Sequence, residues 1–170
     1  MTRWDERIRD EHEALRAQAE DLSAVLSMST TDPESRRSAL VWLLRNVGAT
    51  LDAHLQQEER AGFPALAQLL GSDANALVLL RTQHREVRAA LAALHRRCER
   101  PWNGDAALQW DAIQREGAFF VSLLEDHEQK IERLLIDVLE YSLPTQALHH
   151  VGQAFLAESP WMDDPVEVTS

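Results

Sequence analysis

Several residue types are scarce in this sequence, and each shortage excludes a class of structure. Only six glycines and six prolines occur in 170 residues, while Ala, Leu, Glu, Arg and Gln are abundant, which favours helix over sheet. The single cysteine, Cys98, excludes an internal disulfide and fits a reducing compartment. No apolar run approaches the ~20 residues that span a bilayer, and residues 1–7 lack the apolar core of a secretory signal. We therefore expect a cytoplasmic protein with no membrane partner.

Positive charge is also in short supply. Lys and Arg number 17 against 28 Asp and Glu, and the formal net charge is −11. A field of this sign repels phosphate backbones, so nucleic acid is excluded as a partner. The length fits one domain with a buried core.

The apolar residues of the sequence repeat with the period of an α-helix. Apolar residues recur at three- and four-residue steps through four long stretches. The predicted helices cover about 2–27, 33–71 with Asp32 as N-cap, Ser72 or Asp73 to about Arg100, and about 106–141. We expect a kink or a short break at Phe63-Pro64, and a shorter fifth helix over 144–157. The fold class is all-α: an antiparallel up-down-up-down four-helix bundle over 1–141, followed by a short C-terminal helix and polar tail over 142–170.

One pair within these helices has metal-binding character. His54 and Glu58 are four residues apart, so a helix presents them on one face. Imidazole and carboxylate are both metal ligands. The pair alone is weak evidence for a metal site, because His and Glu at this spacing also form ordinary surface contacts.

An internal repeat adds three more histidines to this pair. His12 is related to His84 by an offset of 72, and His54 to His127 by an offset of 73. The chain therefore consists of two helical hairpins, each with an early and a late histidine. Packed about a pseudo-twofold axis, the four side chains would converge in the core, where metal sites of such bundles are commonly built.

Other interpretations of these histidines have to be weighed. A lone histidine on an apolar face is more often a core residue bonded to a carbonyl than a ligand, and the chain could be a metal-free bundle that acts through protein partners. A ferritin-like carboxylate site requires Glu three residues before His, and none of the seven histidines has it. We expect His95, His149 and His150 to be surface or structural residues, and the acidic pair Asp10-Glu11 to be solvated.

Four short motifs give the sequence a family resemblance. They are Asp10-Glu11-His12-Glu13-Ala14-Leu15; His54-Leu55-Gln56-Gln57-Glu58-Glu59 followed by Phe63-Pro64; Gln83-His84-Arg85-Glu86-Val87-Arg88; and His127-Glu128-Gln129-Lys130-Ile131-Glu132. Jointly they resemble the hemerythrin-like, or HHE cation-binding, family over about residues 5–141.

The resemblance implies a non-haem di-iron centre whose two Fe ions are bridged by oxo and carboxylate groups. His12 and His54 would serve one iron, and His84 and His127 the other. Glu58 would be one bridge. Family members carry the second carboxylate four or five residues after the last histidine, and since position 131 is Ile, only Glu132 matches.

The chain also departs from the family pattern. Hemerythrins proper carry two histidines four apart on the third helix, but here Leu80 and Arg88 stand at that spacing from His84. One iron would have one imidazole fewer, leaving a position open or filled by water or a carboxylate, with Glu59 and Glu128 as candidates.

Such a centre implies a small diatomic ligand or peroxide as the partner, in a monomer or weak homo-oligomer. An imidazole-rich ligand set favours binding or sensing of dioxygen, peroxide or nitric oxide. A missing imidazole tilts the balance towards oxidation chemistry such as catalase-like peroxide decomposition, so whether the protein is an enzyme stays open. Iron storage and iron–sulfur cluster repair are the other di-iron roles, although the N-terminal cysteine-bearing segment of the repair proteins is lacking.

Overall fold

The computed structural model describes residues 3–28, 33–71, 74–100 and 106–157, and these contain helices and no strands. The predicted all-helical class is therefore confirmed. None of the described helices has a stretch long and apolar enough to cross a bilayer. The elements are α1 (Arg3–Ser27), α2 (Pro33–Gln57), the π-helix η1 (Glu58–Gly62), α3 (Phe63–Leu70), α4 (Asn75–Glu99), α5 (Ala106–Ile131), the π-helix η2 (Glu132–Ile136), α6 (Asp137–Ser142) and α7 (Thr145–Ala157).

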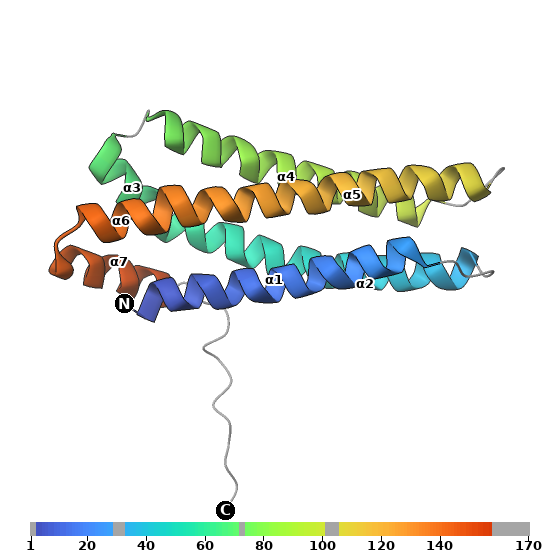
Figure 1. Ribbon diagram of the computed structural model, residues 1–170, viewed down its shortest axis with the longest axis horizontal. Helices are drawn as coiled ribbons and strands as arrows, with labels where there is room; N and C mark the ends of the chain where they lie inside the picture. Colours follow the sequence, from blue (N-terminus) through green and yellow to red (C-terminus); the bar gives the residue numbers. More distant parts are fainter. Residues whose placement is uncertain (1–2, 29–32, 72–73, 101–105, 158–170) are drawn as a thin grey trace, which may run out of the picture.

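Four long helices lie side by side along the length of the molecule (Figure 1). Helix α1 packs against α2 and α5, and α4 packs against the same two helices. In Figure 1, α1 runs away from the labelled N-terminus and α2 returns, and α4 and α5 repeat this course. The short helix α7 packs on α1 and η1, beside the start of the chain.

Two π-helices interrupt the regular helices, and only one of them falls near a predicted interruption. The break expected at Phe63-Pro64 begins at Glu58, because η1 occupies the five residues before Phe63. There the Phe63 amide donates to the Glu58 carbonyl, five residues back, and Pro64, which has no amide hydrogen to donate, falls in the first turn of α3. The break at Glu132–Ile136 is not predicted, and its Asp137 amide donates to the Glu132 carbonyl in the same way.

The predicted helix ends can be compared with the structure at two places. Gly71 ends α3 with φ of +89°, a conformation that favours glycine, and its amide donates to the Ala67 carbonyl at 2.9 Å. Helix α4 begins after Ala74, which makes no side-chain cap. The predicted caps Ser72, Asp73 and Asp32 lie outside the described residues.

The buried apolar side chains form two separate clusters. Cluster 1 consists of Leu15, Ala19, Leu22, Leu26, Leu40, Leu44, Val47, Leu51, Leu55, Val87, Leu94, Cys98, Trp110, Ile113, Phe120 and Leu124. Cluster 2 consists of Ile8, Ala61, Phe63, Ala65, Leu66, Leu77, Leu80, Ile131, Leu135, Ile136 and Leu139. In α1, α4 and α5 the buried histidine lies between residues of cluster 1 and residues of cluster 2, and after His54 of α2 the cluster 2 residues begin at Ala61 in η1. The four histidines therefore form a polar layer between two apolar regions.

Candidate metal centre

One histidine from each long helix enters this layer. His12, His54, His84 and His127 come from α1, α2, α4 and α5, and each is at most 3% exposed. Their rings pair within each hairpin, since the ring centroids are 4.9 Å apart both for His12 and His54 and for His84 and His127. The structure therefore brings together the four histidines that the repeat relates.

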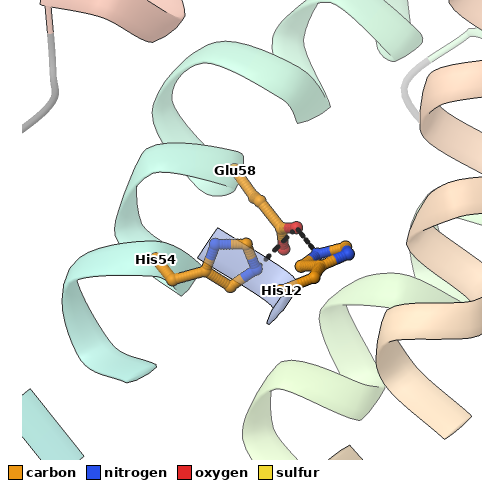
Figure 2. Close-up of side chains that lie close together, drawn as sticks. All are labelled: His12, His54 and Glu58. Atoms are coloured by element: carbon orange, nitrogen blue, oxygen red, sulfur yellow. Dashed lines mark ion pairs between the residues drawn. The ribbon is translucent and has the colours of Figure 1, made fainter. Parts of the chain in front are cut away.

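Glu58 lies between the two pairs and is completely buried. Its Oε1 atom faces the first pair, at 3.8 Å from His12 Nε2 and 3.1 Å from His54 Nε2 (Figure 2). Its Oε2 atom faces the second pair, at 3.0 Å from His84 Nε2 and 3.4 Å from His127 Nε2. Each oxygen of the Glu58 carboxylate thus faces one pair of imidazoles.

The ligand atoms define two overlapping groups. In His12, His54 and Glu58, and again in Glu58, His84 and His127, one ligand atom from each residue lies within 4.8 Å of the others. Both groups are buried, and each can hold a metal ion.

Several of these atoms have no hydrogen-bond partner among the described residues. They include the Nε2 atoms of His12, His54 and His127 and the Oε1 atom of Glu58. The three imidazole nitrogens lie near the Glu58 carboxylate but form no hydrogen bond with it. Buried polar atoms without partners are costly in a folded protein and require an explanation. Imidazole nitrogens converging on a carboxylate are the donor set that borderline divalent metals accept, so these residues fit a metal site.

The charges of the layer are strongly coupled. Burial alone would raise the pKa of Glu58, but the facing imidazoles of His54 and His127 outweigh it and hold that pKa well below its usual range. Burial alone would lower the pKa of His54, but the carboxylates of Glu58 and Glu11 raise it to about 10. The pKa of His127 is lowered, because burial dominates there and Glu58 compensates only in part. Without metal, the layer therefore holds an ion pair on the first hairpin.

The outer edges of three imidazoles also face carboxylates. An outer carboxylate of this kind fixes the orientation and tautomer of a metal-binding histidine. The Nδ1–carboxylate distances are 3.3 Å for His12 and Glu132, 3.0 Å for His54 and Glu11, and 2.7 Å for His84 and Glu59. Glu11 is thus only 13% exposed in its side chain, contrary to the solvated position expected for Asp10-Glu11.

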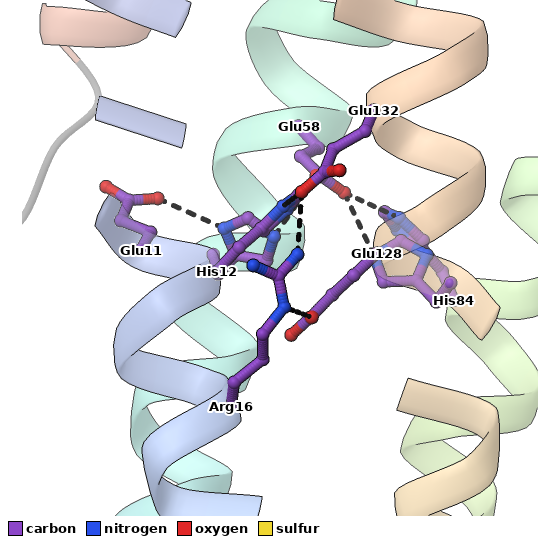
Figure 3. Close-up of polar contacts among 9 residues, drawn as sticks. Glu11, His12, Arg16, Glu58, His84, Glu128 and Glu132 are labelled. Atoms are coloured by element: carbon purple, nitrogen blue, oxygen red, sulfur yellow. Dashed lines mark hydrogen bonds and ion pairs between the residues drawn. The ribbon is translucent and has the colours of Figure 1, made fainter. Parts of the chain in front are cut away.

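Glu132, predicted as the second bridge, lies outside both groups. Its Oε1 atom contacts the outer nitrogen of His12 and accepts a hydrogen bond from Arg16 at 2.6 Å (Figure 3). The side chain is 30% exposed. η2 begins at Glu132 as η1 begins at Glu58, but Glu132 lies beside the outer nitrogen of His12, whereas Glu58 faces the inner one.

The two candidates for the missing ligand differ in their burial. Glu59 accepts a hydrogen bond from Arg88 at 2.6 Å on the outer side of His84, and it is 37% exposed. Glu128 is 1% exposed; Arg16 donates to its Oε2 atom at 2.8 Å, and its Oε1 atom is buried without a partner. Burial raises the pKa of Glu128. Of the two, Glu128 has the buried oxygen that no described residue satisfies.

Glu128 also lines a groove between α1 and α5. The groove has a volume of about 510 Å³, and its walls include Arg16, Ala19, Val121 and Leu124. In Figure 3, Arg16 extends from α1 and is held between the carboxylates of Glu128 and Glu132. The groove therefore reaches Arg16 and Glu128, the residues next to the histidine layer on this side.

Comparisons with known proteins do not identify a family for this chain. No model of a known protein family matches the chain. No curated protein matches it either.

The remaining histidines lie away from the layer. His95 is partly exposed and contacts Glu99 at 3.6 Å, while His149 and His150 are exposed on α7. Sequence reasoning missed the roles of Glu11, Arg16 and Gln83 around the layer. For Arg16 a signal was present, because the repeat aligns it with Arg88, and both arginines bind an outer carboxylate.

Proposed function

We propose that this chain is a hemerythrin-like protein, an antiparallel up-down-up-down four-helix bundle with an additional C-terminal helix that binds two non-haem iron ions. The observation that carries the proposal is the position of Glu58, whose two oxygens each face one histidine pair. The first ion would be held by His12, His54 and Glu58, and the second by Glu58, His84 and His127.

The bound irons would supply an open coordination position for dioxygen, peroxide or nitric oxide. The protein's own residues would exclude bulk water, since cluster 1 and cluster 2 cover the layer from both ends. Glu11, Glu59 and Glu132 would orient the imidazoles through their outer nitrogens. Small molecules would approach along the α1–α5 groove, past Arg16 and Glu128.

Glu128 supports the proposal from a second direction. A third-helix imidazole is missing at the family position, and Glu128 carries a buried oxygen without a partner. We propose that this oxygen completes the ligand set. Glu132 then takes the outer position at His12 in place of the bridging role that the resemblance implies.

Metal analysis of protein expressed in iron-supplemented medium tests the proposal. We expect two irons per chain together with the absorption bands of an oxo-bridged pair. His54→Ala should lose iron, whereas His149→Ala, which changes an exposed histidine on α7, should keep it. Protein that holds no stoichiometric iron, with a His54→Ala variant of unchanged stability, would instead establish a metal-free interaction module.

A second measurement separates the activities that such a centre supports. The ligand set has fewer imidazoles than a hemerythrin proper, which favours oxidation chemistry over reversible binding. We therefore expect the iron-loaded protein to release oxygen from hydrogen peroxide catalytically. Stoichiometric, reversible oxygenation without peroxide turnover would assign an oxygen-binding role instead.

A further inference from the structure

The sequence repeat extends from the histidines to the residues behind them. The offset of 72 that relates His12 to His84 also relates Arg16 to Arg88. The offset of 73 that relates His54 to His127 also relates Glu59 to Glu132. The structural roles of these four outer residues can therefore be compared pair by pair.

The first comparison shows two equivalent chains of contacts. Arg16 donates to Glu132 at 2.6 Å, and Glu132 lies 3.3 Å from the outer nitrogen of His12. Arg88 donates to Glu59 at 2.6 Å, and Glu59 lies 2.7 Å from the outer nitrogen of His84. Both early histidines are thus backed by a carboxylate that an arginine holds in place.

The late histidines are not equivalent. His54 has Glu11 at 3.0 Å from its outer nitrogen. At the offset of 72, the counterpart of Glu11 is Gln83, a neutral residue that is 4% exposed. Gln83 donates through its amide to Asp126 at 2.7 Å. Its Oε1 atom and the Nδ1 atom of His127 are both buried without a partner.

We infer that the two metal positions are unequal, and that the exchange of Glu11 for Gln83 between the hairpins makes them so. The position at His12, His54 and Glu58 has an outer carboxylate behind both imidazoles. The position at Glu58, His84 and His127 has one. An outer carboxylate raises the basicity of a ligating imidazole, and losing one typically lowers metal affinity by about 10- to 100-fold. The first position therefore fills before the second.

This inference deepens the proposed function and rests on the site being a two-metal centre. Anaerobic titration of the metal-free full-length protein with Co²⁺, against a chromogenic chelator, measures the two binding steps separately. In the unchanged protein we expect the steps to differ by about 10-fold or more. His127→Ala should remove the weaker step, and His12→Ala the tighter one.

Charge exchange at the outer positions gives the decisive variants. Glu11→Gln should weaken the tighter step by about 10- to 100-fold. Gln83→Glu combined with Asp126→Asn keeps a hydrogen-bonded amide–carboxylate pair in reversed order, and it should strengthen the weaker step by a similar factor. Because Glu11 is partly exposed, Glu11→Gln should fold normally, and circular dichroism of each variant confirms that it does.

The outcomes separate the inference from the proposed function. Two equal steps in the unchanged protein, or a Glu11→Gln variant that keeps the original affinities, would overturn the inequality and leave the two-metal centre standing. Absence of any stoichiometric Co²⁺ or iron binding would overturn the proposed function, and the inference with it.

Discussion

The two helical hairpins, α1 with α2 and α4 with α5, place their histidines alike but surround them with different charges. On the first hairpin, burial opposes protonation of His54, yet the carboxylates of Glu58 and Glu11 raise its pKa to about 10. On the second, the related His127 has a lowered pKa, because burial outweighs the single facing carboxylate of Glu58. Helix geometry thus places the imidazoles of the two hairpins alike, while a few neighbouring side chains decide how much negative charge faces each imidazole.

The most consequential difference is at the position four residues after each late histidine. Glu58 stands four residues after His54, whereas Ile131 stands four residues after His127 and belongs to cluster 2. One carboxylate therefore faces the histidines of both hairpins, so a change at Glu58 affects both at once.

The largest expected effect is that of Glu58→Gln. The amide keeps the shape of the side chain but removes the charge that faces both histidine pairs, so we expect both metal ions to be lost. Metal analysis after purification measures this. The matched control is Glu59→Gln, which alters a half-exposed outer carboxylate and should keep at least one ion. Retention of two ions by Glu58→Gln would show that another carboxylate bridges the pair.

Next in size is the effect of removing a late histidine from the metal-free protein. His54→Ala leaves Glu58 with a buried charge and without its closest partner on the first hairpin, which should cost about 3–5 kcal/mol of unfolding free energy. His127→Ala removes an imidazole that burial holds neutral, so it should cost less. Urea denaturation of both variants in the presence of a chelator gives the difference. Equal losses would mean that the two hairpins carry the same charge.

A pH series distinguishes the same two histidines, because their pKa values shift in opposite directions on folding. The pKa of His54 is higher in the folded protein, so its contribution to stability is full below pH 6.5 and is lost as the pH rises through about 10. The pKa of His127 is lower in the folded protein, so His127 destabilises the fold as the pH falls below 6.5. For metal-free protein we expect the alkaline decline to disappear in His54→Ala and to persist in His127→Ala. An alkaline decline that survives in His54→Ala would assign it to another group.

The sequence predicts the helices, and it predicts that the four histidines converge in the core, because both follow from periodic spacing. It predicts Glu58 through its position one turn from His54. It does not predict the π-helices η1 and η2, since a shift of the hydrogen bond from the fourth to the fifth preceding residue leaves the apolar pattern almost unchanged. Nor does it predict the contact of Glu132 with the outer nitrogen of His12, since that contact joins two different elements. The contact between Glu11 and His54 joins two helices, and spacing within one helix carries no information about it.

The smallest expected effects are those of the outermost arginines. Arg16 and Arg88 are about one-third exposed or more, and each binds a partly exposed carboxylate, Glu132 and Glu59 respectively. Arg16→Gln and Arg88→Gln should each lower stability by less than about 1 kcal/mol, in line with exposed ion pairs. Urea denaturation compares the two variants directly. A markedly larger loss for Arg16→Gln would show that its second carboxylate, Glu128, extends the asymmetry to the outer surface.

The division of the apolar core has a consequence for cooperativity. Cluster 1 and cluster 2 meet at the histidine layer, which each of the four long helices crosses once. A ligand that binds only the folded layer stabilises it by mass action, and here it would couple two bodies of apolar packing at once. Bound metal should therefore merge their unfolding into one transition, and its removal should let the end that contains α3, α6 and α7 open independently of the rest.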